Sequence, residues 1–160
     1  MRLRPIARVL AARLAGHDLE AVCGPVIGGA LVAQMIAMEL DLEFFHAERI
    51  EAPRAGEMYS ARYRVPNRTR AWLGGKRVAI VDDVINAGSA TRATHSDLTS
   101  CGARPVAIGA LLVLGYAGPK FAADNKLGLE SIMQMPSHVW EPGDCPLCAA
   151  KIALESPEAT

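Results

Sequence analysis

Val78-Ala79-Ile80-Val81-Asp82-Asp83-Val84-Ile85-Asn86-Ala87-Gly88-Ser89-Ala90 is the stretch that decides the fold class of this chain. Its first four residues are apolar and mostly β-branched, which predicts a buried strand. Two carboxylates follow, and a short glycine-containing loop then leads into a helical run from Thr91. Parallel α/β sheets bind ligands at the carboxyl ends of their strands and anions at helix N-termini. The acids suit sugar hydroxyls or a metal and the loop amides suit a phosphate, so the stretch predicts a sugar-phosphate site.

Length and charge set the limits for the rest of the chain. It has 160 residues, of which 51% are hydrophobic, so it is long enough for one domain with a substantial core. Lys and Arg number 17 and Asp and Glu number 17, which leaves a formal net charge of +0. No global field therefore attracts nucleic acid or an anionic membrane, and we expect neither as a partner. Any affinity for phosphate must be local.

The sequence shows no membrane segment and no secretion signal. No stretch has the uninterrupted apolar length of a membrane span, and Arg8 and Arg13 interrupt the only signal-peptide-like region. We therefore expect a cytoplasmic protein.

The remaining pattern alternates helices and strands, as in an α/β fold. Expected helices cover residues 3–15, 30–40 and 89–101, and expected strands cover 19–23, 42–46, 77–81 and 105–114. Residues 24–29 form a predicted turn, and the alternation of apolar and polar residues in 58–65 predicts a β-hairpin arm. Residues 115–160 lack this rhythm and are rich in proline. We predict one domain over 1–160: a doubly wound, mainly parallel sheet (core about 3–114) with a flexible hairpin arm and a small C-terminal appendage (about 115–160).

The two carboxylates are the first candidate site. Successive residues of a strand point to opposite sides, so we expect one of Asp82 and Asp83 to face a ligand and the other to face away or toward a metal's water shell. The alternative is a pair of solvated loop acids. Their position directly after an apolar strand and before a glycine-bearing loop argues against that alternative.

Two loops are candidate phosphate sites. The amides of 85–90 can converge at a helix start, where the dipole adds attraction and Gly88 permits close approach. Residues 23–29 form a second glycine-rich turn between a strand and a helix, so two such loops could hold two phosphates. An ordinary tight turn is the alternative for each. Cys23, at the start of the second loop, is better explained as a small buried hydrophobe than as a nucleophile.

Arginines concentrate between residues 49 and 70. They are Arg49, Arg54, Arg62, Arg64, Arg68 and Arg70. An arm that carries arginines can cover a polyphosphate and exclude water, and the alternative is a solvated hairpin. Arg49 is the strongest candidate because it directly follows a predicted strand.

Four cysteines are present, and two of them, Cys145 and Cys148, have the spacing of half a zinc site. A structural zinc site needs about four ligands, and the chain has no second such pair. His138 or another subunit could complete the site. A capped turn with two reduced thiols is the favoured alternative.

These motifs together closely resemble the type I phosphoribosyltransferases, and within them the orotate phosphoribosyltransferases. The family's signature is an apolar strand followed by Asp-Asp-Val-Ile-Thr-Ala-Gly-Thr-Ala. Here it is Asp82-Asp83-Val84-Ile85-Asn86-Ala87-Gly88-Ser89-Ala90, with Asn86 and Ser89 at the threonine positions. The resemblance extends back through 24–29, similar to the family's pyrophosphate-binding loop, and 45–49, which precede its flexible catalytic loop. It runs forward to about residue 114.

The resemblance implies that Asp82 and Asp83 bind the ribose hydroxyls of phosphoribosyl pyrophosphate and that 86–89 bind its 5-phosphate. It also implies Mg²⁺ near Asp82 and Asp83, held mostly through the ligand and water. The substrate-binding residues implied are Gly24, Pro25, Val26, Ile27, Gly28, Arg49, Arg54, Asp82, Asp83, Val84, Ile85, Asn86, Ala87, Gly88, Ser89 and Ala90. The catalytic candidates among them are Asp82, Asp83 and Arg49.

The implied reaction is displacement of pyrophosphate from the anomeric carbon by a ring nitrogen of a nucleobase, orotate or another pyrimidine. The enzyme would orient the reactants and stabilise the charge on the leaving group, in nucleotide biosynthesis or salvage. The family also implies a homodimer.

The chain departs from the orotate pattern in two places. Residues 49–57 contain neither the lysines nor the histidine of the family's flexible loop, and the sequence begins almost at the first core helix, where the family has a hood segment over the base. Either residues 115–150 hold the base or the hood is absent. A non-catalytic relative that senses phosphoribosyl pyrophosphate or a nucleotide is the alternative function. A generic phosphate-binding domain or a zinc-bearing interaction module is a third.

Overall fold

The computed structural model describes residues 3–51, 62–138, 140 and 143–153. Its helices are α1 (Arg4–Leu14), α2 (Gly28–Leu40), α3 (Asn67–Arg70), α4 (Ser89–Ser100), α5 (Ala117–Asp124) and α6 (Pro146–Ala149). Its strands are β1 (Ala21–Pro25), β2 (Glu43–Glu51), β3 (Arg62–Arg64), β4 (Arg77–Ile85), β5 (Arg104–Leu114) and β6 (Gly128–Met135). Within these residues, no helix combines the length and the apolar character needed to cross a bilayer.

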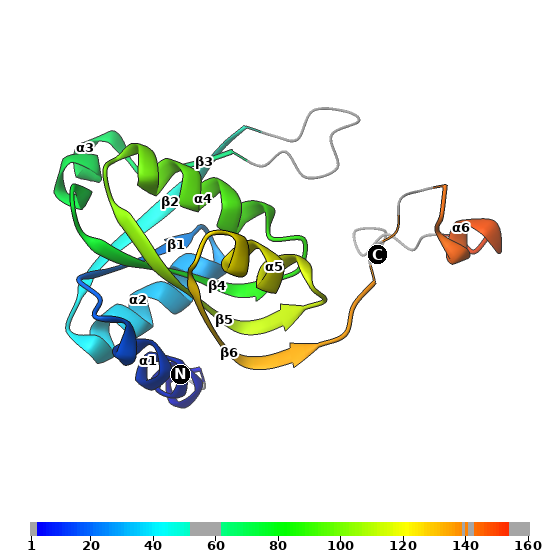
Figure 1. Cartoon of the computed structure of the whole chain (residues 1–160), viewed down its shortest axis with the longest axis horizontal. Coiled ribbons are helices and arrows are strands. Elements are labelled where there is room, and N and C mark those ends of the chain that lie inside the picture. The colour runs from blue at the N-terminus through cyan, green and yellow to red at the C-terminus, as the bar shows by residue number, and fades with distance from the viewer. Residues whose placement is uncertain (1–2, 52–61, 139, 141–142, 154–160) are drawn as a thin grey trace.

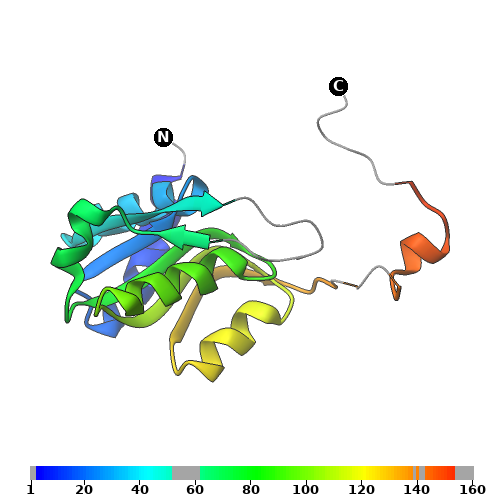
Figure 2. The same cartoon turned by 90° about the horizontal axis from the view of Figure 1, so that it is seen from above.

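The strands form one six-stranded sheet in the order β3-β2-β1-β4-β5-β6. All neighbouring pairs are parallel except β2 and β3. Helices α1 and α2 cover one face of the sheet, and α4 and α5 cover the other (Figures 1 and 2). The predicted doubly wound, mainly parallel α/β fold is therefore confirmed.

Successive side chains of a strand point to opposite faces of the sheet, and this alternation divides the apolar core into two layers. Along β1 and β4, Val22, Ala79 and Val81 pack under α1 and α2, while Cys23 and Ile80 pack on the opposite side. Helix α1 buries residues 7, 10, 11 and 14, the spacing of an amphipathic helix with one face on the sheet. A third apolar cluster lies under α5 and includes Ile85 and Ala122.

The expected end of the core near residue 114 is too early. Strand β6 pairs with β5 from Ala107 opposite Gly128 to Leu114 opposite Met135, and α5 connects the two strands. Sequence patterning missed β6 because it is an edge strand: among its residues only Ser131 is fully buried. A half-exposed strand does not need the long apolar run by which the interior strand β5 was recognised.

Strand β4 is also longer than expected. It continues past Val81 through both aspartates to Ile85, because β5 extends far enough to pair with Asp82, Val84 and Ile85. Asp82 and Asp83 therefore belong to the paired end of β4 rather than to the loop that follows it. Strand β2 likewise runs on to Glu51 and pairs antiparallel with β3, as a hairpin arm requires. The tip of that predicted arm, residues 58–61, lies outside the described residues.

Candidate functional site

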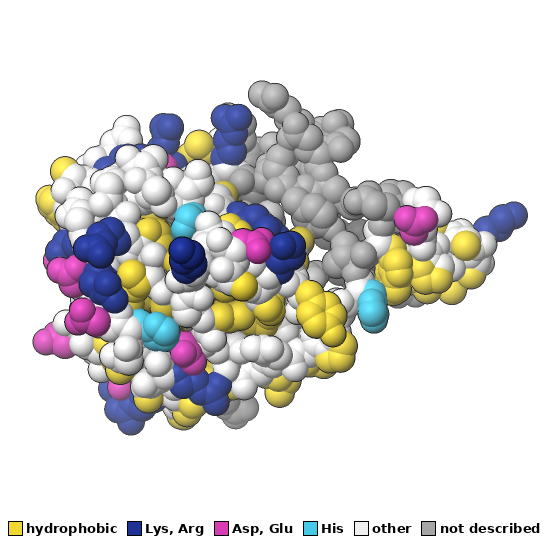
Figure 3. Space-filling model, in the orientation of Figure 1, with side chains coloured by type: hydrophobic (Ala, Val, Ile, Leu, Met, Phe, Trp, Pro, Cys, Tyr) yellow, Lys and Arg dark blue, Asp and Glu magenta, His cyan; other side chains and the backbone are white. Residues whose placement is uncertain are grey.

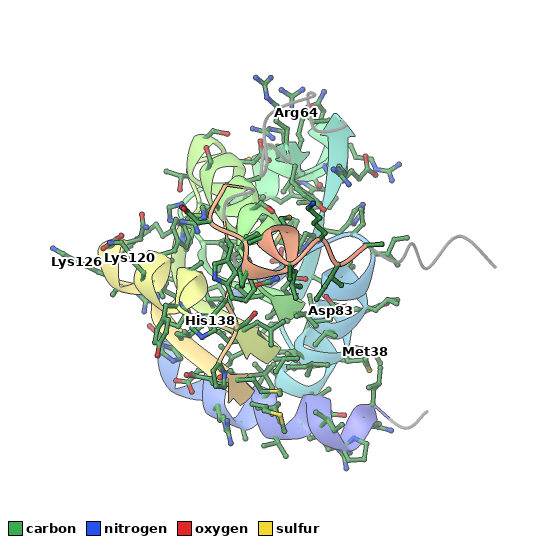
Figure 4. The ribbon with its side chains drawn as sticks, turned by 90° about the vertical axis from the view of Figure 1, so that its right-hand side faces the viewer. Met38, Arg64, Asp83, Lys120, Lys126 and His138 are labelled. Atoms are coloured by element: carbon green, nitrogen blue, oxygen red, sulfur yellow. The ribbon has the colours of Figure 1, made fainter. Side chains whose placement is uncertain are left out.

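The site lies where the carboxyl ends of β1 and β4 meet. These strands are parallel neighbours, with Ala21 opposite Val78 and Cys23 opposite Ile80. The loops that follow them, from β1 to α2 and from β4 to α4, consequently open on the same edge of the sheet. Figure 4 looks onto this edge, with Asp83 near its centre.

The aspartates and the first turn of α2 are in close contact. A Cβ added at Gly28 would overlap the Asp83 carboxylate, and one added at Gly29 would lie 2.6 Å from Asp82 Oδ1. Both carboxylates therefore approach the same helix start, and the expectation that they point to opposite sides is wrong. The backbone at the end of β4 turns enough for the Asp83 N–H to donate to Asp82 Oδ1 (3.0 Å) and for the Val84 N–H to donate to Asp83 Oδ1 (2.9 Å). Only glycine fits opposite this pair.

Asp82 is the more deeply placed acid, with 7% of its surface exposed. Burial, together with the hydrogen bond and the charge of Asp83, raises the pKa of Asp82 to about 8. Two carboxyl groups so close cannot both ionise without cost, because like charges repel in a poorly hydrated site. Perturbed carboxyl groups in such a position mark candidate functional sites.

The loop from β4 to α4 has the features of an anion site. Gly88 occupies the N-cap of α4 with φ of 76°, a left-handed conformation that favours glycine, and no side chain caps the helix. The N-terminal amides of α4 therefore have no side-chain acceptor. They face the same edge as the aspartates, where the helix dipole favours negative charge.

Arg92 is a residue that the sequence analysis missed. Its Nη2 donates to the Ala87 carbonyl oxygen (2.7 Å), and its guanidinium stacks over the Phe121 ring, 5.2 Å from the centroid. The side chain thus lies along the anion loop and places a positive charge beside Gly88. The sequence feature that could have identified Arg92 is its spacing, because it follows Gly88 by four residues and so lies one helical turn further along α4.

The second glycine loop is held between β1, β2 and α2. The Val26 N–H donates to the Ala47 carbonyl oxygen (2.9 Å), and a Cβ at Gly24 would overlap the Gly29 carbonyl. The Val26–Ile27 peptide bond is cis, and the Ile27 side chain is exposed. Helix α2 begins at Gly28, so the predicted turn is shorter than residues 24–29. Cys23 is fully buried, and burial raises the pKa of its thiol, which confirms it as a core residue.

The described arginines between residues 49 and 70 do not lie together at the site. Arg49 is exposed near the end of β2, opposite Tyr63 of β3, whereas Arg54 lies outside the described residues. Arg64 lies well apart from Asp83 (Figure 4). Arg70 instead pairs with Asp97 of α4 at 2.7 Å, a structural contact. Lys and Arg side chains are spread among acidic ones over the face seen in Figure 3, in line with the balanced charge.

Cys145 and Cys148 lie together on α6, away from the aspartates. Cys145 is the N-cap of this short helix, and its side chain makes no capping hydrogen bond. The nearby backbone of Cys148 lowers the pKa of the Cys145 thiol, whereas the Cys145 side chain raises the pKa of Cys148. The described residues contain no cluster of three or more His, Cys, Asp or Glu side chains that could hold a metal, so among them only Cys145 and Cys148 would bind a zinc ion there.

A hollow adjoins the anion loop on its β5 side. Its volume is about 260 Å³, and its lining residues are Asn86, Leu114, Gly115, Tyr116, Ala117, Ser137 and His138. Gly115 brings two segments of the lining close together. Its N–H donates to the Met135 carbonyl oxygen (2.9 Å), and a Cβ on this glycine would lie 2.8 Å from the Ser137 carbonyl oxygen. The His138 ring stacks on Trp140 with centroids 5.8 Å apart. His138 and Asp83 both appear at this edge in Figure 4.

Comparison with known proteins gives a consistent set of relatives, although no family model matches the chain. Orotate phosphoribosyltransferase of Thermotoga maritima is 30% identical over 154 residues, which cover 95% of this chain and 74% of that protein. The enzyme of the same name from Caldanaerobacter subterraneus is 26% identical over 94% of this chain and 72% of its own.

Two solved structures share the fold. Adenine phosphoribosyltransferase of Thermoanaerobacter pseudethanolicus superposes with a TM-score of 0.67 at 23% identity, over 81% of this chain and 77% of that one. Orotate phosphoribosyltransferase of Aeropyrum pernix superposes with a TM-score of 0.61 at 23% identity, over 82% of this chain and 71% of that one.

Proposed function

This chain belongs to the type I phosphoribosyltransferases, a family of enzymes, and from that premise we propose that it transfers the phosphoribosyl group from phosphoribosyl pyrophosphate to orotate. Pyrophosphate is the other product. The single observation that carries the proposal is the contact of the Asp82–Asp83 pair with the glycine turn at the start of α2. That contact brings a carboxylate pair, which suits a sugar diol, between two loops that suit phosphates.

The roles divide by chemistry. Ionised carboxylates only accept hydrogen bonds, so Asp82 and Asp83 would bind ribose hydroxyls, which donate. Backbone amides and the dipole of α4 favour the 5-phosphate over residues 86–89, with Arg92 adding charge. The loop over 24–28 would hold the pyrophosphate, since its glycines allow the backbone to approach closely.

The reaction asks little covalent chemistry of the protein. A ring nitrogen of the base attacks the anomeric carbon as the carbon–oxygen bond to pyrophosphate breaks. The site must hold the reactants in line and stabilise the charge of the leaving group, and both contributions are large in enzymes. Arg49, at the root of the arm, is the proposed cation for that charge, with Arg54 as a second.

The residues present fit a divalent cation delivered with the substrate. Mg²⁺ keeps several waters and binds one or two carboxylates plus substrate phosphates, so a two-carboxylate set is enough. A nearby cation would also favour the ionised form of Asp82, which burial now disfavours. When bound, Mg²⁺ would neutralise pyrophosphate charge. We also propose, from the family, that the enzyme works as a homodimer.

The hollow beside Asn86 is the proposed position of the acceptor base. It is contiguous with the anion loop, and its side chains offer a planar ring from Tyr116 and hydrogen-bonding groups from Ser137 and His138. A base seated there lies on the β5–β6 side of the ribose, opposite the pyrophosphate loop on β1. Residues after β5 would then supply the side chains that bind the base.

Pyrophosphate release tests the assignment. Wild-type protein is assayed with phosphoribosyl pyrophosphate, Mg²⁺ and, separately, orotate, uracil and adenine. Release is expected with orotate, and Asp82→Asn combined with Asp83→Asn is expected to lower it about 10²-fold or more, because the ribose would lose its charged acceptors. Asp124→Asn, on the exposed face of α5, is the control and should retain activity.

Three results would count against the proposal. Full activity of the double variant would remove these residues from the site. Release with adenine but not orotate would make the enzyme a purine phosphoribosyltransferase. Calorimetric binding of phosphoribosyl pyrophosphate without turnover on any base would support the non-catalytic sensor instead.

The acceptor position has its own test. His138→Ala and Tyr116→Ala are expected to raise KM for the base about fivefold, since each removes one contact worth about 1 kcal/mol, and to leave KM for phosphoribosyl pyrophosphate unchanged. Lys120→Ala, whose side chain pairs with Asp124 on the surface, is the control. Equal effects on both KM values would place the base elsewhere.

A further inference from the structure

The paired cysteines on α6 have no part in the transfer reaction. Cys145 is partly exposed and Cys148 is exposed, whereas Cys23 is buried and Cys101 lies against Asp97 (Sγ to Oδ2, 4.0 Å). Figure 1 shows α6 standing off the carboxyl edge of the sheet. Of the four thiols, only this pair combines proximity with access to solvent.

The spacing of Cys145 and Cys148 allows them to react with each other. They are three residues apart on one helical turn, closed by the Ala149 N–H donating to the Cys145 carbonyl oxygen (3.0 Å). Residues three apart on a helix are neighbours on its surface, so a small adjustment of the turn brings the two sulfurs within bonding distance. The backbone of Cys148 lowers the pKa of the Cys145 thiol, which favours the thiolate, the nucleophilic form.

A metal explains this pair less well. A structural zinc ion takes four ligands, and the described residues supply no third donor beside Cys145 and Cys148. A disulfide needs only the two sulfurs. Exposed Cys-x-x-Cys pairs are also the kind that exchange readily, unlike buried structural disulfides.

We propose that Cys145 and Cys148 form a redox-active dithiol that exchanges with low-molecular-weight disulfides and closes reversibly to an intramolecular disulfide. The Cys145 thiolate attacks one sulfur of the small disulfide, forms a mixed disulfide and releases one small thiol. The Cys148 sulfur then attacks the Cys145 sulfur and releases the second small thiol. The protein loses two electrons and two protons, and both pass to the small disulfide, which becomes two thiols.

The test uses the full chain and oxidised glutathione. After incubation the protein is acid-quenched, treated with N-ethylmaleimide and digested with trypsin; residues 127–151 form a peptide that contains Cys145 and Cys148 and no other cysteine. This peptide is expected to lose two hydrogens and take up no maleimide, and dithiothreitol should restore both labels. Cys23 and Cys101 should remain reduced.

Variants separate the two steps. Cys148→Ser should stop at a stable glutathione adduct on Cys145, because the second attack is lost. Cys145→Ser should react at least tenfold more slowly, because nothing lowers the pKa of the Cys148 thiol as the backbone lowers that of Cys145. Cys101→Ser is the matched control and should behave as wild type.

Three outcomes overturn the proposal. The peptide could keep both maleimide labels after prolonged oxidation, or Cys101 could oxidise as fast as the pair. Finally, one equivalent of zinc in the purified protein, released as the thiols are blocked, would assign the pair to a metal site. None of these outcomes depends on transferase activity, so the proposed function stands or falls separately.

Discussion

At Asp82, folding and the proposed ligand binding place opposite demands on one carboxyl group. Burial between β4 and the start of α2, together with Asp83, raises its pKa to about 8. Binding a sugar hydroxyl or a cation calls for the ionised form, which this site disfavours while it is empty of positive charge. In the proposed function, this loss of stability accompanies a pre-formed acceptor, as is common in active sites.

Asp82→Asn is expected to stabilise the free protein at alkaline pH. A raised pKa in the folded state contributes stability that is complete below the ordinary carboxyl value of 3.8 and is lost as the pH rises through about 8. Asparagine does not titrate, and its oxygen can still accept the Asp83 N–H. The variant therefore keeps the stability that the wild type loses when Asp82 ionises. The gain should grow by about 4 kcal/mol between about pH 5 and about pH 9, since each pH unit up to the folded-state pKa contributes about 1.4 kcal/mol.

Urea unfolding at the two pH values measures this difference. Asp124→Asn, an exposed carboxyl on α5, should show no such pH-dependent gain. Equal stability of Asp82→Asn and wild type at the higher pH would mean that Asp82 is not held in a disfavoured charged state.

At the scale of elements, the Asp97 carboxylate links the segment that follows β3 to helix α4. Asp97 of α4 accepts the Val65 N–H (2.8 Å) and two contacts from Arg70 Nη1 (2.8 and 2.7 Å). The Asp97 hydrogen bond in turn raises the pKa of Arg70. The segment after β3 is therefore fixed to α4.

Asp97→Ala is expected to destabilise the protein by about 3 kcal/mol, because it leaves the Val65 amide and the Arg70 guanidinium without their acceptor. Asp124→Ala removes a carboxylate of the same kind from an exposed i,i+4 pair with Lys120 and should cost less than about 0.5 kcal/mol. Thermal unfolding of both variants makes the comparison. Similar losses would show that the Asp97 contacts contribute no more than a surface ion pair.

The elements also show where patterning succeeds. The apolar spacing of α1, the turn at Gly102 after α4 and the long run of β5 were all predicted within a few residues, since each is encoded by local periodicity or by a positive φ (76° at Gly102). The ends of β2 and β4 were predicted too early. Their last residues are strand only because a neighbouring strand extends alongside them.

At the scale of the whole molecule, the sheet needs its last strand. Strand β5 lies between β4 and β6. Its buried residues Ile108 and Val113 belong to the same apolar cluster as Ala122 of α5, so α5 and β6 shield this part of the core from water. A sheet without β6 would expose both that surface and the unpaired edge of β5. The C-terminal third is thus in part structural, and in part the wall of the hollow beside Asn86.

A chain ending at residue 114 is expected to lose cooperative thermal unfolding, whereas one ending at residue 138 should keep it. The first removes α5 and β6, and the second retains every strand of the sheet. Near-ultraviolet circular dichroism and calorimetry distinguish the two. A cooperative transition in the shorter form would make α5 and β6 dispensable for folding.

The sequence by itself determined the α/β class, the two loops and the aspartate pair, because each is carried by a contiguous stretch whose periodicity or glycine spacing is local. Residues 78–90 were enough to indicate a sugar-phosphate ligand. Tertiary structure alone decided that both aspartates face Gly28 and Gly29, that Arg92 lies along the anion loop, that Arg70 serves Asp97, and that β6 completes the sheet. The reason is physical: burial, charge pairing and strand partnership depend on residues far apart in the chain, which no local pattern contains.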